Sequence, residues 1–226
     1  MAILLQTRSS VSLSGRAYTR QKEIRANSTA LKRLAIQYQN GEGVKRHLAL
    51  ALRLFRAAAE DGDADAQFNV GAYLEQGIGG KKDKKQAAIW YERAAGQGNS
   101  AGQYALGVCY MEGVGVAMDK RRAADLFRLA AEQGDADGEW ALGMAFRHGR
   151  GVARDEDAGF AWLLKAAKKG HVDAQFSVGL CYSRGEGVER DIALAEKWYE
   201  KAAKQGDSDA RHNLKLLRAK KKRKPA

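Results

Sequence analysis

The sequence predicts an all-α fold, a right-handed α-solenoid of five 36-residue helix-turn-helix repeats plus a C-terminal capping helix. The main evidence is three sets of glycines that recur every 36 residues along the 226-residue chain. A period of this length is typical of helix pairs that cannot bury their apolar faces alone and therefore stack to share a core. The three sets are Gly41, Gly77, Gly113, Gly149 and Gly185; Gly43, Gly79, Gly115, Gly151 and Gly187; and Gly62, Gly98, Gly134, Gly170 and Gly206.

Residues 172–207 show how one repeat is built. Ala174, Val178 and Tyr182 lie at i, i+4 and i+8, a spacing that puts three side chains on one face of a first helix. The loop Gly185–Gly187 ends that helix, because its two glycines adopt the positive φ that a tight turn requires.

A second helix follows each loop. In four repeats an aspartate stands at its predicted N-cap, where the carboxylate accepts hydrogen bonds from backbone N–H groups of the first turn. The apolar stripe of this helix in residues 172–207 is Ala195, Trp198, Tyr199 and Ala202. The four capping aspartates are Asp83, Asp119, Asp155 and Asp191.

The first repeat and the end of the chain differ from the regular units. Lys32 occupies a position that is aromatic in the four later repeats, and a polar residue is expected there in a terminal repeat. After Asp207, Ala210 and Leu214 continue the register of a first helix and predict the capping helix. The run from Lys220 to Lys224 is predicted to be frayed or disordered.

The repeats also resemble a known family. The stretches Ala101–Gly115 and Ala195–Gly206 are similar to the Sel1-like repeat, a relative of the tetratricopeptide repeat with a longer loop. The resemblance covers the chain from Asn27 to Asn213, with departures at Gly80 and Gly159. It implies a non-enzymatic scaffold or adaptor that binds other proteins within a larger complex and needs no cofactor.

The formal net charge of +12 is concentrated at the two ends of the chain. Residues 1–26 carry +4 and residues 215–226 carry +7, which leaves +1 for residues 27–214. We therefore divide the chain at these boundaries into a basic N-terminal extension, a solenoid and a basic C-terminal tail. The high net charge says little about the solenoid surface itself.

The N-terminal extension is rich in arginine and serine and poor in acidic residues, a composition similar to that of a mitochondrial presequence. A disordered basic extension and a short helix that caps the solenoid are the alternatives. The sequence shows neither a secretory signal nor an apolar run long enough for a membrane span. We therefore expect an intracellular protein, either mitochondrial or else nuclear or cytoplasmic.

The C-terminal tail contains five consecutive cations without interleaved aromatic residues. Such a run has no base-stacking chemistry, so any contact with RNA would be to phosphates. Three interpretations stay open: contact with RNA or a ribosome, a nuclear import signal and a solubilising tail. The first supports an alternative function as a structural subunit of a ribonucleoprotein, such as an organellar ribosome. The five cations are Lys220, Lys221, Lys222, Arg223 and Lys224.

No residue pattern predicts catalysis, a metal site or a cofactor. The glycine loops lie between two helices, and the pattern GxxxxGK[ST] is absent, so they are predicted to be turns rather than phosphate-binding loops. The four histidines occupy four different repeat positions, which gives no set of metal ligands. Cys109 and Cys181 lie two repeats apart, which predicts two thiols too distant for a disulfide.

A surface for partners is predicted on the first helices. With residues placed at 100° steps, one stripe falls outside the two apolar faces of each first helix. Its side chains change from repeat to repeat, as those of a peptide groove would, although an ordinary solvated face fits the same pattern. In solenoids of this family, first helices usually line the concave side. The predicted groove residues are Asn69, Tyr73, Gln76, Glu112, His148, Ser177 and Arg184.

Overall fold

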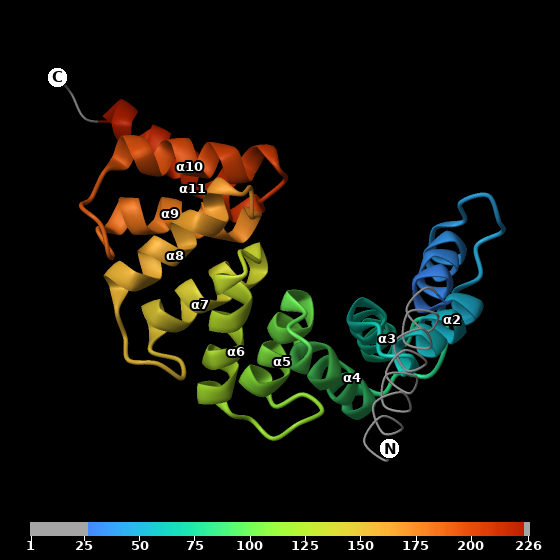
Figure 1. Ribbon diagram of the computed structural model, residues 1–226. Coiled ribbons are helices and arrows are strands. Elements are labelled where there is room, and N and C mark those ends of the chain that lie inside the picture. Colours follow the sequence, from blue (N-terminus) through green and yellow to red (C-terminus); the bar gives the residue numbers. More distant parts are fainter. Residues whose placement is uncertain (1–26, 224–226) are drawn as a thin grey trace, which may run out of the picture. The chain divides into compact units, whose positions relative to one another are not determined.

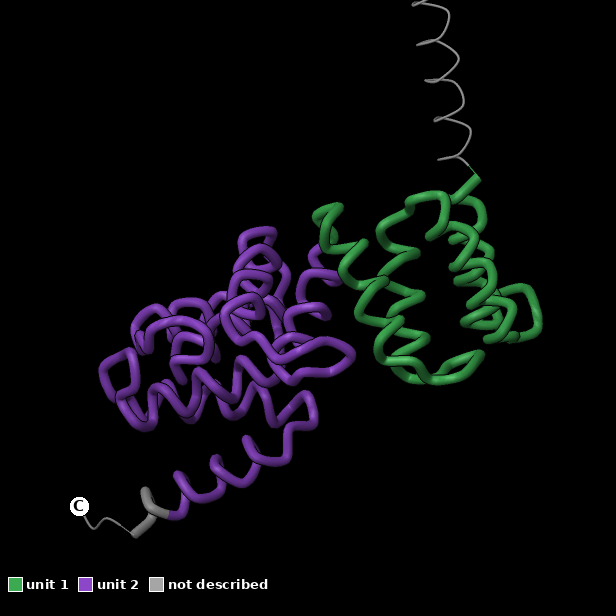
Figure 2. The backbone as a smooth tube through the Cα atoms, turned by 90° about the horizontal axis from the view of Figure 1, so that it is seen from below, with its two compact units in different colours: residues 1–99 green, residues 100–226 purple. Residues whose placement is uncertain are grey.

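A computed structural model describes residues 27–223 of the chain. Every regular element in this range is an α-helix, and the helices follow one another at the predicted 36-residue period (Figure 1). The predicted all-α solenoid class is therefore confirmed. The chain divides into two compact units, Met1–Asn99 and Ser100–Ala226, which Figure 2 shows in different colours. The proposed presequence, residues 1–26, lies outside the described residues.

The first unit holds two repeats. Residues 27–40 form the first helix of repeat one, and α2 (Leu48–Glu60) forms its second helix. Repeat two consists of α3 (Ala64–Gln76) and α4 (Lys84–Gly96). Helix α3 packs against both α2 and α4, so the two repeats of this unit share a core.

The second unit holds three repeats and one further helix. Consecutive helices pack against each other from α5 to α11, and the first helices α5 and α7 also contact each other directly. Within residues 27–223, none of the helices combines the length and the apolar composition that a membrane span requires. The helices are α5 (Ser100–Glu112), α6 (Lys120–Glu132), α7 (Ala136–His148), α8 (Glu156–Lys168), α9 (Val172–Arg184), α10 (Ile192–Lys204) and α11 (Ser208–Arg223).

Helix α11 covers α10, as predicted for a capping helix. Ala210 is buried in a cluster with residues of α10, and Arg218 forms ion pairs with Glu196 and Glu200 of that helix. The helix continues through Arg223, so the prediction of a frayed or disordered backbone was wrong for residues 220–223. The ion pairs of Arg218 stabilise α11 beyond the predicted boundary at residue 214. Lys224 lies outside the described residues.

The loops and caps adopt the geometry predicted from the sequence. All fifteen glycines of the three 36-residue sets have positive φ. The four capping aspartates each accept a hydrogen bond from a backbone N–H of the helix that follows. In the first repeat His47 takes this place and accepts from the N–H of Leu50.

A glycine inside four of the first helices lets the paired second helix approach closely. A Cβ atom added at Gly143 would lie 2.8 Å from Cγ of Leu163, and one added at Gly179 would lie 2.6 Å from a ring carbon of Tyr199. These distances are too short for real Cβ contacts. Leu163 and Tyr199 are both fully buried, so the large side chain of the second helix fills the space above the glycine.

Candidate partner-binding site

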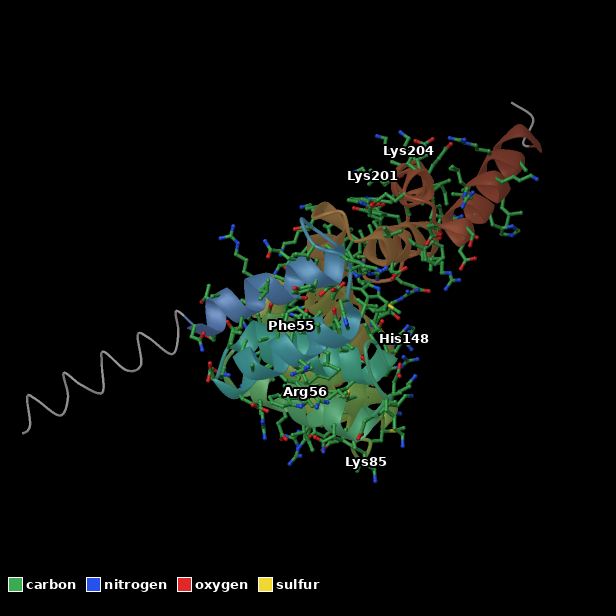
Figure 3. All side chains as sticks on the ribbon, turned by 90° about the vertical axis from the view of Figure 1, so that its right-hand side faces the viewer. Phe55, Arg56, Lys85, His148, Lys201 and Lys204 are labelled. Atoms are coloured by element: carbon green, nitrogen blue, oxygen red, sulfur yellow. The ribbon has the colours of Figure 1, made fainter. Side chains whose placement is uncertain are left out.

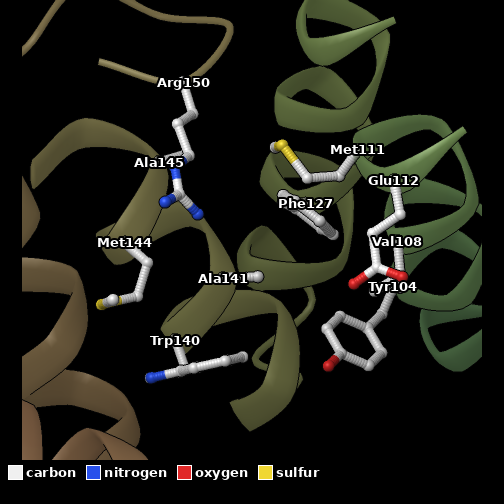
Figure 4. A pocket seen from close by; sticks show the side chains of 10 residues that line it. All are labelled: Tyr104, Val108, Met111, Glu112, Phe127, Trp140, Ala141, Met144, Ala145 and Arg150. Carbon is white, nitrogen blue, oxygen red and sulfur yellow. The ribbon is translucent and has the colours of Figure 1, made fainter. Parts of the chain in front are cut away.

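A hollow of about 230 Å³ opens between α5 and α7, two successive first helices of the second unit (Figure 4). Its walls come from both helices, from Phe127 of α6 and from the loop after α7. Most of the lining side chains are apolar. The lining residues are Tyr104, Val108, Met111, Glu112, Phe127, Trp140, Ala141, Met144, Ala145 and Arg150. We call this site the α5–α7 hollow.

Helical spacing places the apolar walls. Tyr104, Val108 and Met111 lie at i, i+4 and i+7 and therefore share one face of α5. On α7, Ala141 and Ala145 are one turn apart, and their small side chains leave the space between the helices unfilled. The hollow thus lies beside these two alanines, between the larger lining side chains of α5 and those of Trp140 and Met144 on α7.

The orientation of Trp140 is fixed by a histidine. The Trp140 ring stacks on His171, with ring centroids 5.4 Å apart and an interplanar angle of 19°. His171 is the N-cap of α9, where its Nδ1 accepts a hydrogen bond from the N–H of Ala174 at 3.2 Å. Its Nε2 donates to a carboxylate oxygen of Asp137 at 3.0 Å. Because both ring nitrogens are engaged, His171 holds Trp140 against the wall of the hollow.

Two opposite charges stand at the rim of the hollow. Figure 4 shows Arg150 reaching over Ala145 from the loop after α7, while Glu112 projects from the last residue of α5. Neither side chain forms an ion pair or hydrogen bond with any residue of the described range. Both charges are therefore open to a partner.

A comparison with the next pair of first helices, α7 and α9, explains why the space between α5 and α7 is open. Between α7 and α9, Nε of Arg147 donates to Oε2 of Glu186 at 3.0 Å, and the Arg147 side chain is only 9% exposed. One period earlier, between α5 and α7, the same two positions hold Met111 and Arg150. Met111 offers no carboxylate to Arg150, so the buried ion pair of the next repeat has no counterpart here.

Carboxylates of α5, α7 and α9 and of the residue before α7 act on the hydroxyl of Tyr104, one of the lining residues of the hollow. Burial raises the pKa of the Tyr104 hydroxyl, and the negative charges of nearby acids raise it further. These acids are Asp137, Asp135, Asp173 and Glu112, in decreasing order of effect. Asp135 accepts a hydrogen bond from Ser100, whereas Asp173 has no side-chain partner in the part of the chain that the structure describes.

The structure places the predicted groove residues in two groups. Four of them are the last residues of first helices and are exposed, and Figure 3 shows His148 at the surface. Of these four, Glu112 belongs to the α5–α7 hollow, whereas His148 lies just outside it. Whether any of them binds a partner stays a prediction. The four are Gln76, Glu112, His148 and Arg184.

The other three predicted residues offer little surface. Tyr73 and Ser177 are only 4% and 5% exposed, so the prediction that they line an open groove was wrong. Tyr73 packs edge to face against Phe55, and Ser177 lies against Met144 of the preceding repeat. Asn69 is half-buried and donates to a backbone carbonyl of its own helix. At Tyr73 and Ser177 the predicted stripe therefore faces the neighbouring repeat rather than solvent.

Most lining residues of the hollow were missed from the sequence. Tyr104 and Trp140 share the position of the first helices that is aromatic in the four later repeats, and no binding role was predicted for it. The missing signal was the pair of positions 39 residues apart that holds Arg147 and Glu186 in one repeat pair and Met111 and Arg150 in the preceding one. Comparing the residues at these two positions in successive repeats would have indicated the repeat pair in which the ion pair is lost.

The described residues show no set of groups suited to catalysis at the hollow. Across residues 27–223, no three His, Cys, Asp or Glu side chains cluster as a metal site would require. Burial raises the pKa of the Cys181 thiol to about 11, which keeps it protonated and unreactive at neutral pH. What the hollow offers is an apolar surface with charges at its rim.

The family-model comparison decides the relationship of the chain. The model described as Sel1 repeat matches residues 28–63, 64–99, 100–135, 136–171 and 172–207, the same five units that the helices define. The chain belongs to the Sel1 repeat family. Sel1 repeat proteins are typically protein-interaction scaffolds, and the repeat is generally a non-catalytic fold. The resemblance noted from the sequence is therefore confirmed.

Solved structures of Sel1 repeat proteins are similar to this one. A Sel1 repeat protein from Oxalobacter formigenes is 32% identical with a TM-score of 0.79, covering 84% of this chain and 76% of its own. The protective antigen c5321 of uropathogenic Escherichia coli is 34% identical with a TM-score of 0.76, and the match covers 84% of this chain but only 41% of that one. The immunity protein Pa5087 of Pseudomonas aeruginosa, at 23% identity, TM-score 0.56 and coverage of 81% and 67%, shares the fold. No curated protein matches the chain.

Proposed function

We propose that this Sel1 repeat protein is a non-enzymatic scaffold that binds a partner protein through the α5–α7 hollow. The observation that carries the proposal is the loss of the buried ion pair between these two helices. Met111 and Arg150 stand where Arg147 and Glu186 fill the next interface, and the result is an open apolar site. A repeat stack that needed only to be stable would gain from filling this space.

The size of the hollow favours a protein side chain over a small ligand. Its volume of about 230 Å³ is below the range of about 300 to 1,000 Å³ that is usual for small-molecule sites. Aromatic and methionine side chains line it, and these residue types are enriched at protein interfaces. Interfaces commonly depend on a few bulky anchors that enter such pockets. The hollow therefore suits one anchoring side chain of a partner.

The experiment fills the hollow with an ion pair that the same fold already contains between α7 and α9. The double variant Met111→Arg and Arg150→Glu transfers the Arg147–Glu186 pair to the equivalent positions one repeat earlier. Partners are captured on the immobilised full chain and quantified by mass spectrometry. We expect the double variant to keep the stability of the wild type and to lose partners that the wild type retains.

A matched control uses Leu129, an apolar residue of α6 that is 48% exposed and does not line the hollow. Leu129→Gln should retain the same partners as the wild type. Equal retention of every partner by the double variant and the wild type would overturn the proposal. Loss of partners in both the double variant and Leu129→Gln would also overturn it, because the hollow would then have no special role.

We also propose, from the charge of the sequence, that the C-terminal tail contacts nucleic-acid phosphates. Residues 215–226 carry seven cations and no acid, but Arg218 is already paired with Glu196 and Glu200, which leaves six. Six contacts to single-stranded RNA predict a log-affinity against log-salt slope of about −4, from about −0.7 per contact. Deleting residues 220–226 should flatten most of this slope. RNA binding with an unchanged slope after the deletion would contradict the proposal.

A separate proposal concerns the subcellular location of the protein and rests on residues 1–26. Their similarity to a presequence supports import into mitochondria. A fusion of these residues to a fluorescent protein should then reach the mitochondria, whereas a fusion with its arginines replaced by glutamine should stay in the cytosol. Identical cytosolic distributions of the two fusions would contradict a mitochondrial address.

A further inference from the structure

The first unit has a cluster of cations where the loop between α3 and α4 packs on the start of α2. A Cβ atom added at Gly79 would lie 2.5 Å from the carbonyl oxygen of Leu48, so this loop contacts the first turn of α2. Residues 41–47 lead into α2 at the same point. We call the cations of residues 41–47 and 77–85 the basic edge. They are Lys45, Arg46, Lys81, Lys82, Lys84 and Lys85.

The positive charge of the basic edge is not balanced by acids. All six side chains are exposed, and the five lysines form no ion pair or hydrogen bond with any residue between 27 and 223. The same two segments contain only two acids. Glu42 accepts a hydrogen bond from Asn40, and Asp83 caps α4. Six cations and two acids leave four positive charges at this edge.

The fold does not require these lysines. Lys84 and Lys85 stand in the first turn of α4, where the helix macrodipole disfavours cations. The equivalent residues of α8 are Glu156 and Asp157, so this turn of the repeat also accepts acids. At the position of Lys81, the three later repeats have Ala117, Ala153 and Glu189. Helix stability and the repeat pattern therefore do not explain the basic edge.

Gly80 leaves the backbone uncovered beside the lysines. It does not have the positive φ that would require a glycine. An added Cβ would meet nothing closer than a methyl group of Leu52 at 3.4 Å, so a side chain would fit. Glycine is typical of places where a ligand approaches the backbone closely. The other four repeats have valine at this position: Val44, Val116, Val152 and Val188.

Phosphate is the ligand chemistry that fits the basic edge best. Lysine binds phosphate as a compact point charge, whereas the planar fork of arginine suits bidentate contacts with carboxylates. Lysine is depleted at protein interfaces, and none of the large exposed apolar side chains of the described chain lies in the two segments. Stable attachment to a membrane needs an apolar or lipid anchor besides charge. A nucleic acid binds through its backbone charges alone.

We propose that the basic edge of the first unit binds the phosphate backbone of a nucleic acid. The two segments belong to successive repeats in contact, so one strand meets cations from both. Contacts of this kind position a strand and do not read its sequence. The inference goes beyond the proposed function, because the basic edge uses neither the α5–α7 hollow nor the C-terminal tail.

The test measures fluorescence anisotropy of labelled uridine and cytidine 20-mers with the full chain at several salt concentrations. Each contact with a phosphate of a single strand contributes about 0.7 to the slope of log affinity against log salt. Lys81→Gln, Lys82→Gln and Lys85→Gln together should therefore make the slope less steep by about 2. The C-terminal tail is the same in both proteins, so the difference reports on the basic edge. The two oligomers should bind within about twofold of each other.

A matched control removes three exposed lysines of the second unit. Lys168→Gln, Lys197→Gln and Lys204→Gln change the net charge of the chain by the same amount, and these lysines have no ion pair among the described residues. The control protein should keep the slope of the wild type, because its lysines lie outside the basic edge.

A second variant separates binding from stability. Lys84→Glu with Lys85→Glu gives α4 acids at the positions where α8 has them. The melting temperature should stay the same or rise, because the macrodipole favours acids in a first turn. Affinity for the uridine 20-mer should fall at least about tenfold at about 0.1 M salt, since two contacts are lost.

Four results would overturn the inference. In the first, the slope is unchanged in the variant of Lys81, Lys82 and Lys85. In the second, the control flattens the slope equally, which would mean that only net charge acts. In the third, a labelled glutamate 20-mer loses as much affinity in that variant as the uridine 20-mer, which would assign the basic edge to an acidic protein segment. In the fourth, neither oligonucleotide binds the full chain.

Discussion

Lys169 Nζ lies 2.8 Å from Oε1 of Glu139, and this ion pair replaces a pair of glutamines that the other regular repeats have at the same two positions. Lys169 also donates to the backbone carbonyl of Gly134 at 2.7 Å. The glutamines that bridge a first helix to the end of its second helix are Gln97 with Gln67, Gln133 with Gln103, and Gln205 with Gln175. One bridging position thus accepts either two amides or two opposite charges.

The bridge predicts an unequal effect of single and double substitutions. Glu139 is only 3% exposed, so removing the cation with Lys169→Met leaves a buried carboxylate and should cost about 2 kcal/mol of unfolding free energy. The double variant Glu139→Gln and Lys169→Gln restores the amide pair and should stay within about 1 kcal/mol of the wild type. Urea unfolding of the three proteins measures both differences. A loss in the double variant as large as that in Lys169→Met would contradict the bridge.

The close approach of α7 and α8 predicts that Gly143 tolerates no large side chain. Gly143→Leu should lower the unfolding free energy by more than about 2 kcal/mol, because a Cβ there meets Leu163 and the carbonyl of Gly159. The control is Gly96→Ala at the end of α4, where an added Cβ meets nothing within 4 Å. This control should be neutral or more stable by up to about 1 kcal/mol. Thermal unfolding followed by circular dichroism distinguishes the two, and equal melting temperatures for Gly143→Leu and the wild type would refute the packing.

The ion pair of Arg147 and Glu186 predicts a pH dependence of stability. Burial disfavours the charge of Glu186, but the hydrogen bond and charge of Arg147 outweigh burial and hold the pKa of this carboxyl below its usual value. A lowered folded pKa means that the unfolded chain binds the proton more tightly. The stabilisation is therefore fully present above the unfolded pKa of about 4.3 and is lost as the pH falls through the folded pKa.

We expect Glu186→Gln to lower the unfolding free energy at pH 7 by about 2 kcal/mol and to make it less dependent on pH below about pH 5. Glu189→Gln, an exposed residue of the same loop, is the control and should change neither quantity. Urea unfolding between pH 3 and pH 7 provides the measurement. The interpretation fails if Glu186→Gln and the wild type differ by the same amount at both ends of this range.

Burial of Cys181 predicts a thiol that reacts only after unfolding. With its pKa raised to about 11, the thiol has roughly two orders of magnitude less thiolate at pH 8 than an exposed cysteine. In a Cys109→Ala background, alkylation by iodoacetamide should therefore be slow in buffer and fast in urea. Rapid alkylation of the folded protein would show that the α9 interface opens readily.

How much of the structure the sequence could predict depends on how local its causes are. The turn at Gly185 and Gly187 and the cap at Asp191 follow from the conformations and hydrogen bonds of a few adjacent residues, so the loops and helix starts were predicted correctly. The burial of Tyr73 and Ser177 depends on side chains of other helices, Phe55 and Met144, which a helical wheel of one repeat does not include.

The α5–α7 hollow depends on still longer-range relations. It forms because Met111 cannot pair with Arg150, and this is visible only when the two positions are compared with Arg147 and Glu186 of the next repeat. The exchange at Glu139 and Lys169 is of the same kind, since each residue is understandable only together with its partner 30 positions away. Single positions therefore predict the repeat, and pairs of positions distinguish one repeat from another.

Photo-crosslinking from the hollow tests the central claim most directly. Met111 is replaced by the photoreactive residue p-benzoylphenylalanine in the full chain, and Leu129 is replaced in a matched control. After irradiation in cells, the crosslinked partner peptides are sequenced by mass spectrometry. We predict that residue 111 crosslinks to a bulky apolar residue of a partner protein, and that residue 129 does not crosslink to that segment. Equal crosslinking of the same segment from both positions, or none from residue 111, would contradict the claim that the α5–α7 hollow is the partner-binding site.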